Sequence, residues 1–261
     1  MPQSASSTTF AIKGDLAVRL AAGAGEIAAA QKLRYRVFYE ELNARPDAAA
    51  AAARIDADRF DGICDHLIVT NGSDLVGTYR LLRQDVAEVN GGFYTQNEFD
   101  LAPLITAHPG LRFLELGRSC VLKPFRTRPV VELLWQGIWN YVRHHRLNVM
   151  LGCASLEGTD PDRHAATLTY LARNHSAPRE WRVCAHPQRY VEMNRLPAAQ
   201  VDPKAALKEL PPLIKGYLRL GCYIGEGAVI DAQFNTIDVL IVLPVSAIDA
   251  RYLAHFGKPN D

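Results

Sequence analysis

At 261 residues the chain is long enough for one large domain or two small ones. Hydrophobic residues make up 48% and charged residues 22%, which is typical of a soluble globular protein with a full core. The net charge of +1 provides no overall field that attracts nucleic acid or a membrane, so electrostatic binding must be local. A nucleic-acid partner is not expected.

The sequence predicts a cytoplasmic protein. The N-terminal stretch MPQSASSTTF lacks the cationic start and long apolar core of a signal peptide. No window approaches the roughly 20 apolar residues of a spanning helix. The five cysteines form no CxxC pair and are expected to be buried free thiols in a reducing compartment (Cys64, Cys120, Cys153, Cys184 and Cys222).

Hydrophobic periodicity predicts one α/β domain with a mixed central β-sheet flanked by helices. Residues 1–14 are polar and expected to be disordered, and the domain is expected to span 15–261, with a core to about 190 and an α/β extension over about 191–261. The alanine run 48–53 is either a short helix or a mobile segment, and Gly225-Glu226-Gly227 is expected to be a turn. The predicted strands are 16–20, 65–70, 75–83, 111–122, 148–153, 181–185 and 236–244, and the predicted helices are 26–42, 129–146, 162–174 and parts of 203–220.

The stretch ELGRSCVLKPFRTRPVVELLW joins a predicted strand directly to a predicted helix. Proline in the first helical turn suits a helix start and leaves free backbone N–H groups beside Arg126 and Arg128. With the positive end of the helix dipole, this arrangement favours an anion such as a phosphate. The alternative is a solvated basic loop that only caps the helix.

Motifs of other transfer chemistries are absent from the sequence. It has no GxxxxGK[ST] phosphate loop, no GxSxG nucleophile elbow and no HxxxxD acyltransferase pair. His144 and His145 are adjacent, but no third ligand accompanies them, so no metal site is expected. Direct transfer without a covalent enzyme intermediate is the chemistry that these absences leave open.

The strand–VxxPxxR–helix junction resembles the cofactor loop of the Gcn5-related N-acetyltransferase (GNAT) fold, also called the acyl-CoA N-acyltransferase fold. In that family the loop holds the phosphates of coenzyme A or of the phosphopantetheine arm of acyl carrier protein. The usual RxxGxG/A is replaced here by Arg126-Thr-Arg128-Pro129-Val. Because a loop without glycine fits a pyrophosphate less well, the resemblance favours a carrier protein, which presents one phosphodiester.

Further motifs resemble the acyl-homoserine-lactone synthase branch of this fold. Its RxxxF helix, acidic [ED]xDxxD cluster, GxxR strand and ExxR strand occur here in the same order. They correspond to Arg34-Tyr-Arg-Val-Phe38, Asp56-x-Asp58-x-x-Asp61, Gly77-Thr-Tyr-Arg80 and Glu115-x-x-Arg118.

The second half, with GCASLEGTDPDRHAATLTYL and LPPLIKGYLRLGCYIGEGAVIDAQFNTIDVLIVLP, resembles the L-ornithine N-acyltransferases of bacterial ornithine-lipid synthesis. This resemblance implies transfer of a 3-hydroxyacyl group from acyl carrier protein to the α-amine of L-ornithine, which gives lyso-ornithine lipid. The donor is then carried on 4'-phosphopantetheine, and no bound cofactor is expected. An acyl-homoserine-lactone synthase and a non-catalytic acyl-binding module of the same fold remain as alternatives.

Glu115 is the best-placed carboxylate to accept a proton from the amine, because its strand is otherwise apolar. The alternative is a structural pair with Arg118. Strand alternation puts these two side chains on opposite faces unless a bulge intervenes near Gly117. A backbone N–H near Cys120–Val121 is expected to hold the thioester oxyanion.

The remaining charged motif residues are expected to bind the two substrates. Asp56, Asp58 and Asp61 offer negative charge to a cationic amine, or else form a solvated loop. Arg34 and Arg80 either hold the substrate carboxylate or support the aspartates. Lys123, Arg126 and Arg128 are expected to bind the donor. An acyl carrier protein is acidic, so its docking face should be basic, and the candidates are Arg126, Arg128, Arg143, His144, His145 and Arg146. The alternative is that these residues form a solvated charged face.

Residues 204–220, KAALKELPPLIKGYLRL, mix leucines with lysines. This composition is typical of interfacial helices that touch anionic lipid, so a peripheral contact with the inner membrane is one expectation. The alternative is that the leucines pack on the main sheet.

Overall fold

The computed structural model describes residues 9–249. The chain forms two compact units: the first contains the described residues 9–91 and 116–146, and the second contains 92–115 and 147–249. Neither unit is one continuous stretch of sequence. The single domain over 15–261 stays a prediction.

The sheet of the first unit follows the strand order β1-β2-β3-β4-β6. β2 (Leu16–Leu20) and the antiparallel hairpin of β3 (Asp65–Asn71) and β4 (Asp74–Arg83) confirm predicted strands. β6 (Phe113–Val121) also confirms a predicted strand, and its residues from 116 onward belong to this unit. The expectation of disorder up to residue 14 is wrong for 9–13, which form β1 (Thr9–Lys13) because they pair antiparallel with β2. Residues 1–8 lie outside the described part of the chain.

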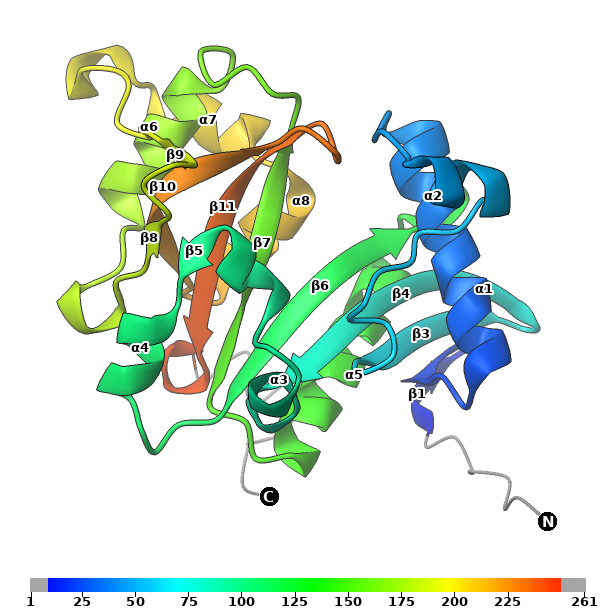
Figure 1. The fold of residues 1–261 in the computed structure, drawn as a ribbon. Coiled ribbons are helices and arrows are strands. Elements are labelled where there is room, and N and C mark those ends of the chain that lie inside the picture. The colour runs from blue at the N-terminus through cyan, green and yellow to red at the C-terminus, as the bar shows by residue number, and fades with distance from the viewer. Residues whose placement is uncertain (1–8, 250–261) are drawn as a thin grey trace. The chain divides into compact units, whose positions relative to one another are not determined.

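Two long helices pack against this sheet on opposite faces, α1 (Ala24–Tyr35) on one and α5 (Arg128–His144) on the other (Figure 1). A Cβ on Gly137 of α5 would lie 2.7 Å from Val18 Cγ2, so the glycine permits the close approach of helix to sheet. The predicted helix 26–42 changes to a π-helix, η1 (Arg36–Glu41), after α1. The alanine run is a helix, α2 (Ala48–Ala53), whose first turn Asp47 caps by accepting the N–H of Ala50. The short helices of this unit are α3 (Gln84–Val89) and η3 (Lys123–Phe125).

The sheet of the second unit is mixed. The first three residues of β6 pair parallel with β7 (Val149–Glu157), as the predicted β-α-β order requires. β11 (Thr236–Pro244) lies antiparallel between β7 and β10 (Tyr223–Asp231). The short strands β5 (Phe99–Asp100), β8 (Cys184–Ala185) and β9 (Tyr190–Val191) complete it.

The expectation of a turn at Gly225-Glu226-Gly227 is wrong, because these residues lie inside β10. The register of β10 on β11 shifts between Ile224 and Ala228, so the stretch is an irregular strand. A Cβ on Gly227 would lie 2.4 Å from the ring of Tyr190, which explains the glycine. Of the predicted strand 181–185, the first residue belongs to a 3-10 turn, η4 (Arg179–Trp181), and β8 contains only the last two.

Helices of the second unit confirm the remaining predictions. α6 (Ala165–Asn174) packs against β10, and residues 203–220 form α7 (Pro203–Glu209) and α8 (Pro212–Arg219), separated at the two prolines. Among the described residues, no helix has the length and apolar character needed to cross a membrane. The other short helices are η2 (Tyr94–Asn97), α4 (Ala102–Ala107), η5 (Ala198–Gln200) and η6 (Val245–Ala247).

Candidate functional site

Four motifs of the first unit meet in a buried arginine–aspartate cluster. Arg34 of α1 is 1% exposed. Its Nε donates to Asp56 Oδ2 at 2.7 Å, and its Nη2 donates to Asp61 Oδ1 at 2.6 Å and to the carbonyl of Asp56 at 2.5 Å. The irregular segment between α2 and β3 is therefore tied to the helix by one guanidinium group.

Two more arginines reach the same segment from neighbouring strands. Arg80 Nη1 of β4 donates to Asp58 Oδ1 at 2.7 Å, and Arg118 Nη2 of β6 donates to Asp58 Oδ2 at 3.1 Å. Arg118 Nε also lies 3.4 Å from Asp56 Oδ2. All six motif residues of the cluster, which we call the arginine–aspartate network, are thus in contact through ion pairs (Arg34, Asp56, Asp58, Asp61, Arg80 and Arg118).

The network balances its charges, with three arginines facing three aspartates. Burial opposes the ionisation of Asp58, but Arg80 and Arg118 outweigh it and hold the pKa of that carboxyl below its ordinary value. Burial also lowers the pKa of His66, whose Nε2 lies 3.0 Å from the carbonyl of Asp61, so this histidine favours its neutral form. An excess of negative charge, which the sequence suggested for this motif, is not present within the network.

The backbone of β6 is irregular beside the network. Arg118 has a φ of +50°, a left-handed conformation that a non-glycine residue adopts at a cost of about 1 kcal/mol or more. This interruption lies one residue beyond Gly117, where a bulge was expected from the sequence. The side chain of Arg118 is 12% exposed and that of Asp58 is 25% exposed, whereas that of Arg34 is 1% exposed.

The strand-to-helix junction follows β6 in the same unit. Cys120 is buried, and the carbonyl of Val121 accepts a hydrogen bond from Arg126 Nε at 3.0 Å. Lys123 begins η3, and Arg128 is the first residue of α5, with Pro129 next to it as expected for a helix start. Arg126 and Arg128 each form an ion pair with a glutamate, Glu41 and Glu132.

Glu115 belongs to the second unit and is 5% exposed. Its Oε1 accepts the N–H of Thr95 at 2.7 Å and its Oε2 accepts the N–H of Tyr94 at 3.0 Å. The carboxylate therefore holds the start of η2 in place.

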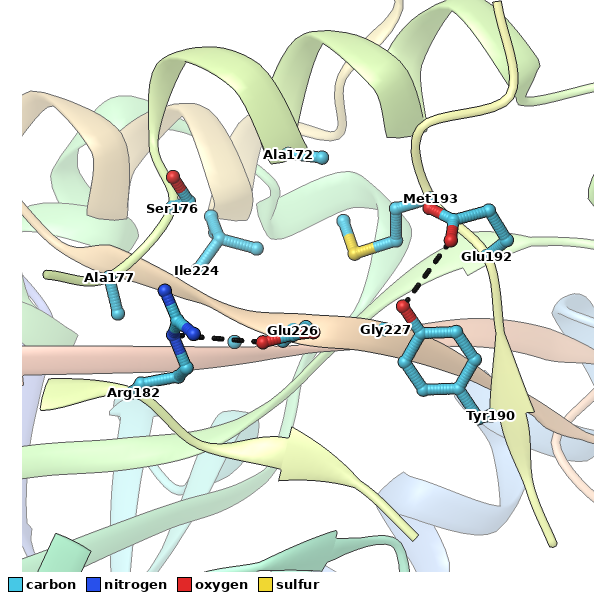
Figure 2. A pocket seen from close by; sticks show the side chains of 11 residues that line it. Ala172, Ser176, Ala177, Arg182, Tyr190, Glu192, Met193, Ile224, Glu226 and Gly227 are labelled. Atoms are coloured by element: carbon cyan, nitrogen blue, oxygen red, sulfur yellow. Dashed lines mark hydrogen bonds and ion pairs between the residues drawn. The ribbon is translucent and has the colours of Figure 1, made fainter. Parts of the chain in front are cut away.

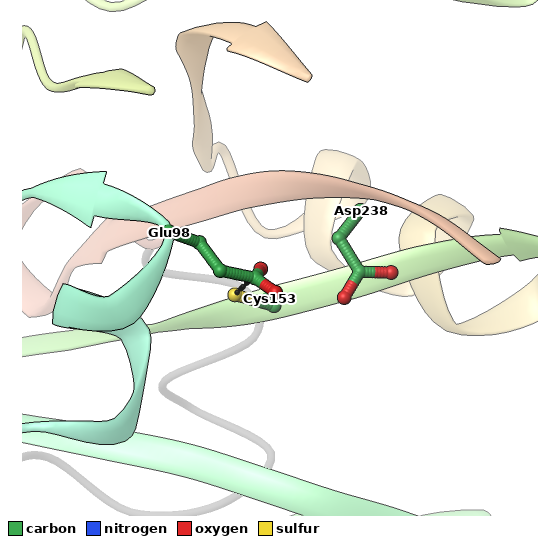
Figure 3. A group of neighbouring side chains, drawn as sticks. All are labelled: Glu98, Cys153 and Asp238. Atoms are coloured by element: carbon green, nitrogen blue, oxygen red, sulfur yellow. Dashed lines mark hydrogen bonds between the residues drawn. The ribbon is translucent and has the colours of Figure 1, made fainter. Parts of the chain in front are cut away.

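A second polar group of this unit, absent from the sequence prediction, consists of Glu98, Cys153 and Asp238 (Figure 3). Their ligand atoms lie within 4.8 Å of one another, a spacing that could hold a metal ion. Cys153 Sγ donates to Glu98 Oε2 at 3.2 Å, and Arg189 Nη2 lies 3.4 Å from Glu98 Oε1. Burial and then the charge of Asp238 raise the pKa of Glu98 to about 7, so this carboxyl is partly protonated at neutral pH.

A cavity of about 320 Å³ lies beside β10 in the second unit (Figure 2). Arg182 and Glu226 form an ion pair of 3.7 Å across part of its wall, and Tyr190 Oη donates to Glu192 at 3.5 Å. None of its lining residues belongs to the arginine–aspartate network or to the strand-to-helix junction. They are Ala172, Ser176, Ala177, Arg182, Tyr190, Glu192, Met193, Ile224, Gly225, Glu226 and Gly227.

Several polar residues of these sites were not predicted. Glu132 follows Arg128 by four residues, a helical spacing that indicates an ion pair and could have been read from the sequence. Glu41, Glu98, Cys153 and Asp238 give no such signal, because their partners are more than 50 residues away or on other strands.

Comparison with known proteins identifies the class. The family model described as "Acetyltransferase (GNAT) domain" matches residues 33–136. In the solved structures, the chain is similar to FeeM, an N-acyl amino acid synthase from uncultured soil microbes, with a TM-score of 0.50 and 14% identity over 88% of this chain and 91% of that one. The chain therefore has the acyl-CoA N-acyltransferase (GNAT) fold that its motifs predicted.

Relatives of known activity identify the family within this fold class. The chain is 51% identical to the L-ornithine N(alpha)-acyltransferase of Agrobacterium fabrum (strain C58) over 94% of its own length and 86% of the relative's. It is 39% identical to the L-ornithine N(alpha)-acyltransferase of Rhodobacter capsulatus over 92% of its own length and 94% of the relative's. The chain belongs to the family of L-ornithine N(alpha)-acyltransferases.

The raised pKa of Glu98 predicts a loss of stability with rising pH. In the unfolded chain this carboxyl titrates near about 4.3. In the folded state it titrates near about 7, so the folded state binds more protons between these values. The free energy of unfolding therefore falls as pH rises through this window. Glu98→Gln removes this titration. From pH 5 to pH 8 the free energy of unfolding of the variant, relative to that of the wild type, should therefore rise by about 1–3 kcal/mol. Urea unfolding at the two pH values measures this difference.

Glu180→Gln, which changes an exposed carboxylate of the same unit, is the matched control. If Glu98→Gln and the wild type show the same change in unfolding free energy between the two pH values, Glu98 does not titrate as stated.

Proposed function

We propose that the chain transfers a 3-hydroxyacyl group from acyl carrier protein to the α-amine of L-ornithine and so forms lyso-ornithine lipid. The observation that carries this proposal is the identity of 49–51% to three L-ornithine N(alpha)-acyltransferases over 93–94% of the chain. In this reaction the amine nitrogen attacks the thioester carbonyl, a C–N bond forms, the C–S bond breaks, and the carrier thiol leaves.

The acceptor amine must lose a proton to react. An α-amino group titrates near about 8, so a modest base is enough. Glu115 is our choice for this base, since Tyr94 and Thr95 fix the orientation of its carboxylate. A backbone N–H near Cys120–Val121 is our choice for the group that stabilises the thioester oxyanion.

The attack is direct in this proposal, without an acyl-enzyme. Burial raises the pKa of the thiols of Cys120, Cys153 and Cys222, which disfavours the thiolate that a covalent route requires. This supports attack by the amine itself.

The arginine–aspartate network is our proposed binding site for ornithine. Arg34, Asp56, Asp61 and Arg80 are nearly inaccessible, so they act by holding the segment in place. Asp58 and Arg118 have the more exposed side chains, and they are the ones we assign to contact with the amine and the carboxylate of the substrate.

The basic junction is our proposed site for the donor. Lys123, Arg126 and Arg128 lie next to the start of α5, where the helix dipole also favours an anion. The single phosphodiester of 4'-phosphopantetheine fits this site, and the acidic carrier protein fits a basic face.

A peripheral membrane contact is also part of the proposal. Leu210, Ile214 and Tyr217 are buried within the second unit, which supports the packing alternative for these positions. Leu207 remains 41% exposed on α7 near Lys204 and Lys208, and these residues are the part of the segment that we assign to anionic lipid.

The first prediction of the proposed function concerns the acceptor. With 3-hydroxyacyl carrier protein and an amino-acid panel, kcat/KM for ornithine should exceed that for glycine or serine by about 10²-fold or more. The physical reason is that a site with a polar partner for a second amine rejects analogues that lack it. Products are identified by mass spectrometry.

Ornithine blocked at the α-amine is the control and should give no product, whereas δ-blocked ornithine keeps the reacting group. Equal turnover of glycine and ornithine contradicts the proposed acceptor.

The second prediction concerns Glu115. Glu115→Gln should lower kcat by about 10²–10⁴-fold per folded molecule, the range for a lost general base. The amide also places an N–H₂ group opposite the N–H of Tyr94 or Thr95, so a loss of stability of about 1–3 kcal/mol is expected in parallel. The folded fraction is measured by circular dichroism at the assay temperature. Near-normal kcat per folded molecule means that the residue is structural.

A further inference from the structure

The cations of the strand-to-helix junction are already paired with carboxylates of the same unit. Both oxygens of Glu41 bond to Arg126, one of them to Nη2 at 2.9 Å. Glu132 Oε1 accepts from Arg128 Nε at 2.6 Å, and its Oε2 accepts from Lys13 Nζ at 2.9 Å. Any phosphate that binds here must share these cations with two glutamates.

The position of Glu41 is set by packing. It ends η1, and the residues Val37 and Phe38 of this π-helix pack with Leu33 against Cys120 and Leu122 at the end of β6. The N–H of Leu42 bonds to the carbonyl of Val37 at 3.0 Å and closes the wide turn. Buried apolar contacts of its helix thus place the backbone of Glu41 where its carboxylate reaches Arg126.

The position of Glu132 is set by its helix. It lies on α5 four residues after Arg128, and Lys13 of β1 approaches it from the edge of the sheet. Hydrogen bonds from Lys13 and Arg128 hold the pKa of Glu132 at about 2, so it is negatively charged at any physiological pH.

These pairs leave the junction with a small positive charge. The cations are Lys13, Lys123, Arg126 and Arg128, and the two carboxylates cancel half of them. A single phosphodiester needs one positive charge. Coenzyme A brings a diphosphate and a 3'-phosphate, whose additional charges would be repelled by Glu41 and Glu132.

We infer that Glu41 and Glu132 determine the donor specificity of this enzyme: they favour a thioester carried on one phosphodiester and disfavour the same acyl group on coenzyme A. This inference rests on the proposed donor site at the junction. It assigns a role to two residues outside the recognised motifs.

The test compares thioesters of one acyl group on coenzyme A and on pantetheine, which has no phosphate. The variants are Glu41→Gln, Glu132→Gln and the double variant, since glutamine keeps the shape and an acceptor oxygen but removes the charge. The ratio of kcat/KM for acyl-coenzyme A to that for acyl-pantetheine should rise about threefold in each single variant and about tenfold in the double variant. In about 1 M salt the increase should shrink, because exposed charges are then screened.

Glu40→Gln is the matched control. Glu40 precedes Glu41 on η1 but pairs with Arg54, outside the junction, so its variant should keep the wild-type ratio. A double variant with an unchanged ratio overturns the inference, as does an equal rise in Glu40→Gln.

Binding of free coenzyme A, measured by calorimetry on the same proteins, separates this inference from the proposed reaction. If the double variant binds coenzyme A about tenfold more tightly, the inference is supported. If no donor supports acylation of ornithine, only the proposed function is defeated. Unchanged binding together with normal ornithine acylation defeats only the inference.

Discussion

The guanidinium group of Arg34 links a helix to the irregular segment that carries the acidic motif. It is 1% exposed and bonds to Asp56 and Asp61, and through Asp56 and Asp58 the network extends to Arg80 and Arg118 on two strands. Taking so many charges out of water is costly, and each is tolerated because its partner is present. Removing one partner would leave an uncompensated charge in the core of the first unit. The network therefore divides its residues into buried members that hold the segment and more exposed members, Asp58 and Arg118, that can meet a substrate.

At the strand-to-helix junction, which we propose as the donor site, Glu41 and Glu132 offset part of the charge of the cations around the start of α5. A site of small net charge suits a substrate of small charge. In both places the chain supplies its own counter-ions, so a substrate bound as we propose would exchange partners with them. The second unit contributes carboxylates of another kind: Glu115, held by two backbone N–H groups, and Glu98, whose burial raises its pKa to about 7.

Much of the architecture could be predicted from hydrophobic periodicity, because α1, α5 and the strands β2, β3, β4, β6 and β11 have clear apolar patterns. β1 and β10 could not be predicted. β1 has only five residues, follows a polar stretch and forms by pairing with β2. β10 contains two glycines, and only the neighbouring side chains of Leu240 and Tyr190 show why glycine is needed at these positions. The resemblance of the motifs assigned Arg34, the three aspartates, Arg80 and Arg118 to one site, and these side chains are in contact in the structure. Their pairing could not be predicted, since it depends on distances between elements far apart in the sequence, and the same holds for Glu41 beside Arg126.

The division of the network into holding and contacting residues is tested most directly by the free energies of unfolding of two matched variants, Asp61→Asn and Asp58→Asn, measured by urea denaturation. The side chain of Asp61 is 6% exposed and that of Asp58 is 25% exposed. Asp61→Asn should lose about 3–5 kcal/mol, because Arg34 then keeps a buried charge with one partner fewer. Asp58→Asn should lose less, about 1–2 kcal/mol, because Asp58 is itself partly solvated, although Arg80 and Arg118 each lose one partner. Equal losses in the two variants, or a larger loss for Asp58→Asn, would contradict this account.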